Sequence, residues 1–329
     1  MLNPGQKLNP KLYDLAIEQA PIRNGFGEGL LVAAEENPDV VGLCADLTES
    51  TKMLAFKEKF PERFVEIGVA EQNLATVASG MAAMGKIPFI TSYAMFSPGR
   101  NWEQIRTTIS YNDQPVKIAG SHAGISVGPD GGTHQAIEDI ALMRVIPNMH
   151  VIVPCDAIEA AKATIEAAKT KSPTYIRLGR EKSPIITTDH SPFEVGEANL
   201  LYNPAKPAAL IVACGPLVYN ALMAAKKLAA ESIEVAVLNL HTIKPLDEDA
   251  IAILAKKAGA VVTVEEHQIF GGMGSAVAES LARNWPVPME FVGVYDEFGQ
   301  SGTPAELIEH YGMDISHIVE AVERVVRRK

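Results

Sequence analysis

The stretch that decides the fold is Phe64-Val65-Glu66-Ile67-Gly68-Val69-Ala70-Glu71-Gln72-Asn73, which continues as a helical pattern to Met84. Residues 64–69 form a short apolar run that predicts a buried strand. From Glu71 onward the apolar spacing becomes helical, so a helix is expected to begin directly after the strand. A carboxylate in the first turn of a helix is favoured by the helix dipole. Taken alone, Glu71 would therefore be a structural residue.

The same alternation of strand and helix fills the first half of the chain. Predicted buried strands lie at residues 40–47, 64–69, 87–94, 116–122, 150–155 and 174–178. Helical patterns lie between several of them, at 71–84, 135–145 and 157–170. Continuous apolar strands that alternate with helices indicate a parallel sheet covered on both faces.

The alternation stops at residues 181–207 and then resumes. This stretch contains four prolines and little periodicity, which predicts a linker. Further strands are expected at 209–214, 235–240, 260–265 and 289–294, with helices at 217–230, 247–257 and 275–283. The predicted fold class is therefore α/β, with two doubly wound domains. The larger domain is expected at 1–190 and the smaller one at 191–329.

Composition excludes several classes of protein. A formal net charge of −11 argues against a nucleic-acid binder, because phosphate contacts need clustered lysine and arginine. Cys44, Cys155 and Cys214 are far apart among apolar neighbours, which predicts neither a zinc site nor a disulfide. The longest uncharged stretch, 207–225, is interrupted by Gly215-Pro216 and fits a strand, turn and helix better than a membrane span. With no apolar signal region at the start, a soluble cytoplasmic protein is expected.

Polar and aromatic residues follow the predicted strands of the first domain. Ligands of such sheets bind outside the carboxyl ends of the strands. Tyr93 and Phe96 follow one strand and are suited to form a flat wall for an aromatic ring. His122, Asp130 and His134 lie in a glycine-rich loop after another strand. Asp-Gly-Gly is turn chemistry, but two flanking histidines are harder to explain by a turn alone.

Two glycine motifs have weaker interpretations. Gly124-Ile125-Ser126-Val127-Gly128 fits the nucleophile elbow of hydrolases, which requires a helix immediately after the serine turn. Residues 129–132, Pro-Asp-Gly-Gly, cannot begin that helix, so a hydrolase is a minor alternative. Gly271-Gly272-Met273-Gly274 lacks the spacing of a dinucleotide fingerprint. It is interpreted as allowing the next helix to pack closely on its strand.

As an ordered set, these motifs resemble the transketolase family. The resemblance is carried by residues 68–73, by Tyr93-Ala94-Met95-Phe96, by the run from Gly128 to Gln135 and by residues 146–156. Glu265-Glu266-His267 with the glycines at 271–274 resembles the last domain of that family. The resemblance covers nearly the whole chain, but only the C-terminal part of a full transketolase. It implies a pyrimidine-binding domain followed by a transketolase C-terminal domain.

The resemblance implies roles for individual residues around thiamine diphosphate. Glu71 matches the glutamate that binds N1′ of the aminopyrimidine and activates the cofactor. Tyr93 and Phe96 match aromatic residues against the pyrimidine ring, and Asp46 matches an aspartate near the cofactor at the dimer interface.

Other positions match the sugar-phosphate site of the family. Residues aligned with those that hold the substrate phosphate are Arg23, Ser50, His122 and Arg180. Asp130 and His134 align with catalytic residues that bind the ketose hydroxyls near the scissile bond. The implied reaction transfers a two-carbon ketol unit from a ketose phosphate to an aldose phosphate, as in the pentose phosphate pathway.

Some positions depart from the common transketolase pattern. Gln72-Asn73 after the glutamate is closer to deoxyxylulose-phosphate synthase, whereas His122 favours a transketolase. Gly99 stands near the place of a further aromatic residue, with Arg100 beside it. A synthase of that type, or the β subunit of a 2-oxo acid dehydrogenase, is the alternative thiamine-dependent enzyme. A non-catalytic partner subunit is the alternative outside enzymes.

The family binds the cofactor diphosphate through a metal and a Gly-Asp-Gly motif, which this sequence lacks. Mg²⁺, or Ca²⁺ in its place, needs oxygen ligands together with the diphosphate. No metal ligand is therefore expected in this chain. A partner subunit carrying the diphosphate-binding domain is expected, with the active site at the interface. A symmetric α2β2 heterotetramer is the natural assembly of such a split enzyme.

Overall fold

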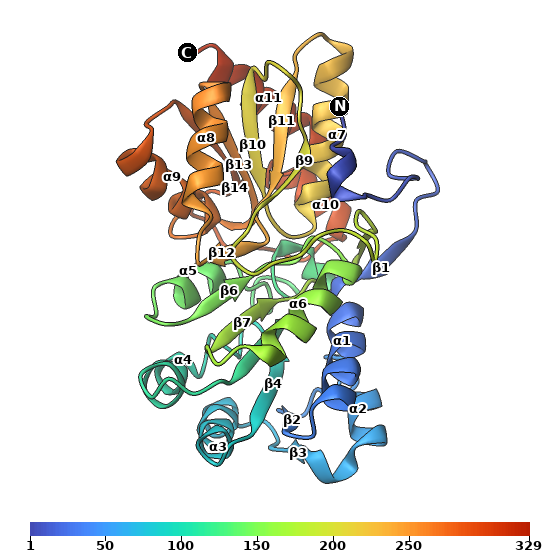
Figure 1. Ribbon diagram of the computed structural model, residues 1–329, viewed down its shortest axis with the longest axis vertical. Coiled ribbons are helices and arrows are strands. Elements are labelled where there is room, and N and C mark those ends of the chain that lie inside the picture. The colour runs from blue at the N-terminus through green and yellow to red at the C-terminus, as the bar shows by residue number, and fades with distance from the viewer.

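Seven strands form the sheet of the first domain in the computed structural model, which describes residues 1–329 (Figure 1). Their order across the sheet is β12 (Thr242–Lys244), β6 (His150–Ile152), β7 (Thr174–Arg177), β5 (Lys117–Ser121), β4 (Ile87–Tyr93), β2 (Val40–Cys44) and β3 (Phe64–Glu66). Every neighbouring pair is parallel except β12 with β6. The predicted buried strands are all present, with shorter bounds than the apolar runs.

Helices cover both faces of this sheet, as expected. One face packs against α1 (Ile22–Glu36), α2 (Leu54–Lys59) and α6 (Ala157–Lys169). The other face packs against α3 (Glu71–Ala83), α4 (Trp102–Gln104) and α5 (Asp139–Arg144). Helix α1 was not predicted, because its glycines lower helix propensity. They serve packing: a Cβ on Gly25 would lie 1.7 Å from the main-chain oxygen of Ala157 on α6.

The second domain has a sheet of five strands. Their order is β14 (Met289–Val294), β13 (Val261–Gln268), β10 (Ala209–Ala213), β11 (Val235–Asn239) and β9 (Asn199–Tyr202). All are parallel except the edge strand β9. One face carries α7 (Leu217–Ala230), α10 (Pro304–His310) and α11 (Ile315–Val326). The other face carries α8 (Glu248–Ala258) and α9 (Met273–Asn284).

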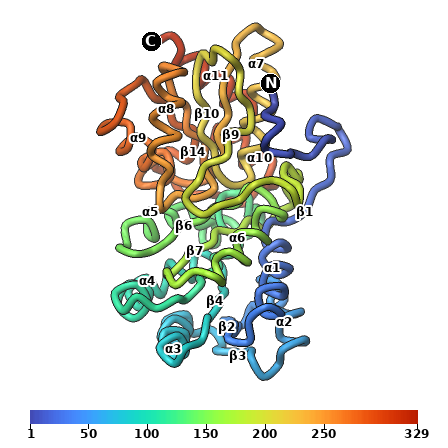
Figure 2. Tube along the Cα trace, viewed as in Figure 1, coloured from blue at the N-terminus to red at the C-terminus, as the bar shows by residue number.

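The predicted linker is more ordered than its composition suggested. β8 (Lys182–Pro184) pairs with β1 (Gln19–Pro21), and β9 joins the second sheet. The chain also crosses between the domains twice more. β12 follows β11 in sequence but extends the first sheet. Residues 1–17 run along the second domain, so both termini lie at that end of the molecule (Figure 2).

The helix expected at 135–145 is shorter than predicted. α5 begins only at Asp139, because the preceding residues are held in other contacts. The Gln135 side chain donates to the main-chain oxygens of Ile125 and Gln300. Ala136 forms a parallel bridge with Ala123 and accepts a hydrogen bond from Arg177.

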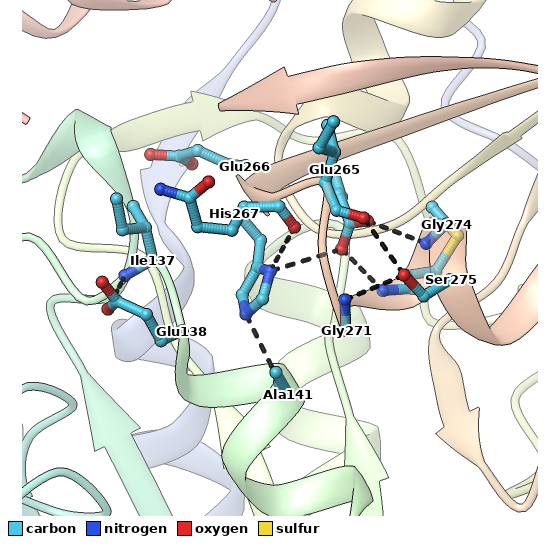
Figure 3. Close-up of polar contacts among 12 residues, drawn as sticks. Ile137, Glu138, Ala141, Glu265, Glu266, His267, Gly271, Gly274 and Ser275 are labelled. Atoms are coloured by element: carbon cyan, nitrogen blue, oxygen red, sulfur yellow. Dashed lines mark hydrogen bonds and ion pairs between the residues drawn. The ribbon is translucent and has the colours of Figure 1, made fainter. Parts of the chain in front are cut away.

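A buried polar cluster joins the two domains, which we call the interdomain cluster: Asp139, Tyr175, Arg177, Glu265, Glu266 and His267. Figure 3 shows Glu265 and His267 on β13 facing the glycine turn at 271–274 and Ala141 of α5. Glu265 accepts from the main-chain N–H groups of Met273 and Gly274 at the start of α9. A Cβ on Gly274 would lie 2.6 Å from Thr263 Oγ1, which confirms the close helix–strand packing expected of this motif.

The three cysteines are buried and unpaired, as predicted. None of the helices combines the length and the apolar composition needed to cross a bilayer.

Candidate active site

Glu71 is the first residue of α3 and is only 2% exposed. Its Oε2 atom forms an ion pair with Arg100 Nη1 at 2.8 Å. Its Oε1 atom accepts no hydrogen bond from the chain. Glu71 also lines a cavity of about 540 Å³, together with neighbouring residues of the α3 N-terminus, Arg100 and Gln104. One half of a nearly buried carboxylate is thus available to a ligand. This differs from a helix-start acid, which would cap its own helix.

The aromatic wall predicted from the sequence is formed at the end of β4. The rings of Tyr93 and Phe96 lie 6.3 Å apart at an interplanar angle of 17°. His122 stacks on Tyr93 with centroids 3.8 Å apart. The His134 ring meets Phe96 edge-on at 5.5 Å, so the loop that follows β5 closes over the same wall. Four flat side chains from two neighbouring strand ends therefore meet in one place.

Arg23, Arg180 and His122 form a cationic corner beside this wall. Arg23 Nη1 lies 3.5 Å from His122 Nε2 and also donates to the main-chain oxygen of Ser50. Burial, and then the nearby charge of Arg180, lower the pKa of Arg23. Burial lowers the pKa of His122 to about 3, with Arg23 and Arg180 acting in the same direction. His122 is therefore a neutral hydrogen-bonding group, and the positive charge comes from the arginines.

The cationic corner is only weakly neutralised by carboxylates. Arg180 lies 3.9 Å from Asp130 and 3.6 Å from Glu181, both longer than a good ion pair. Arg23 has no carboxylate within ion-pair distance. Two adjacent guanidinium groups without a close counter-charge favour binding of an anion.

The loop that bears Asp130 and His134 is held by the second domain. The main-chain N–H of Ser126 donates to Glu266 Oε1 at 2.5 Å. Gln135 Nε2 donates to Gln300 O at 3.0 Å. A Cβ on Gly132 would lie 2.6 Å from the main-chain oxygen of Gly299. The interdomain contacts thus fix the position of two predicted substrate residues.

Asp46 and Ser50 lie in the loop after β2, at the same sheet edge. Asp46 adopts a left-handed backbone conformation with φ 58°. Glu66 holds this turn by accepting from the N–H of Asp46 at 2.8 Å and from Thr48 Oγ1 at 3.0 Å. Ser50 reaches Arg23 through its carbonyl rather than its hydroxyl. The Asp46 side chain forms no hydrogen bond or ion pair with the other predicted site residues. The Glu71 carboxylate also contacts none of them directly, because its partner is Arg100.

Three residues that shape this site were not predicted from the sequence: Glu66, Arg100 and Asn101. Asn101 is fully buried and donates to the main-chain oxygen of Glu71 at 2.9 Å. Arg100 was noted only because Gly99 stands beside it. The Arg100-Asn101 pair, which directly follows Gly99, was the available sequence signal for these two site residues. Their contacts depend on a turn that pattern analysis does not predict.

The serine of the elbow-like motif does not form a nucleophile site. Residues Ile125–Asp130 form a 3-10 segment, in which Gly128 has φ 82°, and no helix follows. The nearest polar partner of Ser126 is Glu266, and no histidine contacts it. In addition, the chain has no group of three histidine, cysteine, aspartate or glutamate residues placed to hold a metal ion.

Comparison with known proteins identifies the family of both domains. Residues 18–185 match the family described as "Transketolase, pyrimidine binding domain", and residues 196–318 match "Transketolase, C-terminal domain". The chain is 39% identical over 317 residues to a 6-deoxy-6-sulfo-D-fructose transketolase subunit of Clostridium sp. (strain MSTE9), covering 96% of this chain and 98% of that one. It is 35% identical over 307 residues to one subunit of the apulose-4-phosphate transketolase of Phocaeicola vulgatus, covering 93% and 97%.

A solved structure gives the same result for the fold. The chain resembles a split-gene transketolase, described as an inactive beta4 tetramer, with a TM-score of 0.87 and 45% identity over 93% of this chain and 98% of that one. The relatives are subunits of split enzymes of nearly the same length. The chain therefore belongs to the transketolase family and contains its pyrimidine-binding and C-terminal domains.

Proposed function

We propose that this chain is the C-terminal, or β, subunit of a split thiamine-diphosphate-dependent transketolase. The observation that carries the proposal is the joint arrangement of Glu71, the Tyr93–Phe96 wall and the cationic corner along one sheet edge. A carboxylate that lines a cavity and has one unpartnered oxygen, together with a flat aromatic surface, suits a protonatable heteroaromatic ring. The corner suits the anionic end of a sugar.

The chemistry that thiamine diphosphate supplies when bound is a nucleophilic carbon able to attack the substrate carbonyl. Glu71 would hold N1′ of its aminopyrimidine through Oε1 and exchange a proton with it. Tyr93 and Phe96 would orient the ring by contact with its face. Because the carboxylate is almost fully buried, water competes weakly for that proton.

The substrate would bind on the other side of the wall. Arg23 and Arg180 would hold the anionic terminus, with His122 as a neutral hydrogen-bond partner. Asp130 and His134 would bind the ketose hydroxyls near the broken bond, and Asp46 would lie near the cofactor at the subunit interface. Closure of the loop 122–134 over Phe96 would keep water from the reacting carbon.

The diphosphate and its Mg²⁺ or Ca²⁺ would bind to a partner chain. The absence of a Gly-Asp-Gly sequence supports this division, as does the split relative, which is described as an inactive tetramer of β chains. An α2β2 assembly would place two such composite sites about a two-fold axis.

A donor panel tests the proposed reaction. The chain, combined with the diphosphate-domain subunit, thiamine diphosphate and Mg²⁺, is given xylulose 5-phosphate, apulose 4-phosphate, 6-deoxy-6-sulfofructose or pyruvate, with ribose 5-phosphate as acceptor. The cationic corner accepts phosphate or sulfonate, so transfer from at least one of the three sugars is expected. Activity with pyruvate alone would favour the synthase or dehydrogenase alternative.

A further inference from the structure

The residues Arg100 and Asn101 hold Glu71 at both of its ends, and we call this pair the Glu71 clamp. Arg100 Nη1 donates to the carboxylate oxygen Oε2 at 2.8 Å. Asn101 Nδ2 donates to the Glu71 main-chain oxygen at 2.9 Å and to Ser97 Oγ at 3.2 Å. The clamp therefore fixes both the start of α3 and the direction of the carboxylate.

The turn before α4 positions the clamp. The Arg100 N–H donates to the Phe96 carbonyl, and the Gly99 N–H donates to that of Ala94. A Cβ on Gly99 would lie 1.9 Å from the Met95 carbonyl oxygen, so this turn requires glycine. Gly99 stands near the position where a further aromatic residue is common in the family. The turn that it permits thus allows the side chain of the next residue, Arg100, to reach Glu71.

Arg100 also contacts the aromatic wall. Its guanidinium carbon lies 4.7 Å from the centroid of the Phe96 ring, which is a cation–π distance. The Arg100 side chain is about half exposed, whereas that of Glu71 is 2% exposed. Arg100 thus lines the Glu71 cavity, and its guanidinium contacts the Phe96 ring of the wall.

From this geometry we infer that Arg100 is the positioning residue for Glu71. It binds Oε2 and leaves Oε1 without a partner in the chain, free to bind a ring nitrogen. Without this partner the carboxylate would have no hydrogen-bond donor from the chain on either oxygen and would be free to rotate. The expected effect on turnover rests on the proposed function, whereas the expected effect on the position of Glu71 does not.

The geometry of the clamp predicts which residues are able to replace Arg100. The contact is a single N–H···O bond plus a cation over a ring, so a lysine is able to replace it, which is not true of bidentate arginine sites. Arg100→Met removes the charge but keeps most of the side-chain length. Arg106→Met is the matched control, because Arg106 is exposed on the next turn and forms no ion pair.

The test has a kinetic part and a structural part. In the reconstituted pair, Arg100→Met is expected to lower kcat about 10- to 100-fold, the range of one charge-assisted hydrogen bond, while the KM for the sugar and the Kd for thiamine diphosphate by calorimetry change less than about threefold. Arg100→Lys should recover most of the turnover, and Arg106→Met should behave like wild type.

Two results from the reconstituted pair would overturn the inference. Tighter thiamine diphosphate binding by Arg100→Met would show that Arg100 blocks the site rather than orients Glu71. An unchanged kcat would show that the ion pair is only structural.

Crystal structures of the isolated wild-type and Arg100→Met chains supply the readout that is independent of catalysis. Glu71 is expected to leave its position or to spread over several rotamers in the variant, with α3 still beginning at residue 71. An unmoved Glu71 carboxylate would contradict the clamp even if the wild-type pair showed no transketolase activity.

Discussion

Charged side chains are buried in two regions of this molecule. The two regions differ in how far these side chains find hydrogen-bond and ion-pair partners within the chain. In the interdomain cluster, Arg177 donates to Asp139 at 2.8 Å and to the main-chain oxygens of Ala136 and Glu266. At the sheet edge, Glu71 keeps one oxygen free and Arg23 has no carboxylate partner. Within the cluster Asp139 Oδ1 is buried without a partner, whereas the unpartnered oxygen at the sheet edge belongs to Glu71, which lines a cavity. A network whose polar groups are mostly partnered within the chain indicates architecture, whereas an unfilled partner beside a cavity indicates a ligand. The following predictions test this distinction.

The largest expected effect is the loss of activity on changing Glu71. In the reconstituted pair, Glu71→Gln should lower kcat about 100- to 10,000-fold, the usual contribution of a positioned acid–base group. Steady-state ketol transfer measures it. Glu62→Gln, on the exposed surface one turn before β3, is the control. A fully active Glu71→Gln pair would instead support a non-catalytic subunit.

Breaking the interdomain cluster should reduce the stability of the fold rather than the intrinsic rate of ketol transfer. Arg177→Met leaves Asp139 as a buried, uncompensated charge, which costs about 3–5 kcal/mol. Thermal unfolding of the isolated chain measures the change, and Arg100→Met is the comparison because the Arg100 side chain is half exposed, whereas that of Arg177 is buried. Adding Asp139→Asn should restore part of the loss. Equal losses of melting temperature in Arg177→Met and Arg100→Met would contradict the distinction between the two regions.

A second buried carboxylate between the domains should give a pH-dependent stability. Burial, and then the charge of Asp156, raise the pKa of Glu159 from 4.5 to about 7. The folded chain then holds a proton that the unfolded chain has lost between pH 4.5 and 7, so stability falls as pH rises through this window, by at most about 1.4 kcal/mol per pH unit.

Glu159→Gln should remove this slope. Asn239 donates to Glu159 Oε1, and its own Oδ1 is buried without a partner. A flipped Asn239 amide would accept from the new glutamine. Melting temperatures of the wild type and of Glu159→Gln, measured between pH 5 and 8, test this prediction. Parallel curves of melting temperature against pH would show that Glu159 is ionised throughout this range.

Arg23→Met should weaken recognition of the anionic end of the donor. Losing one hydrogen bond to a charged group costs about 1.5–3 kcal/mol, or roughly 10- to 150-fold in kcat/KM. The corresponding sugar without its phosphate is the control substrate, and its kcat/KM should stay unchanged. An equal loss with both sugars would mean that Arg23 supports the wall through His122 and does not bind the anion.

Ser126→Ala should have the smallest effect, within about 0.5 kcal/mol in stability and none in ketol transfer. The substitution keeps the main-chain N–H of Ser126, which donates to Glu266 Oε1, and removes only the hydroxyl. Loss of an esterase activity in this variant would revive the hydrolase alternative.

Strand positions and the edge that bears the site followed from apolar periodicity. Buried parallel strands have few alternatives, and their carboxyl ends necessarily share an edge, so Tyr93 and His122 were expected to meet. The α1 helix was missed because Gly25 and Gly29 serve contact with α6 rather than helix propensity. The helix at 135–145 was drawn too long because Gln135 binds residues far away in sequence. The Arg100 contact depends on one turn geometry, for which the sequence carries no periodic signal.

The most direct test of the shared site is a titration of the diphosphate-domain subunit into a fixed amount of this chain, with thiamine diphosphate, Mg²⁺ and the sugar phosphates present. We predict no ketol transfer by either chain alone and a rate that rises linearly to a plateau at an equimolar ratio. Full activity of the isolated chain, or no activity of the pair with any anionic ketose, would contradict the claim that Glu71 belongs to half of a shared site.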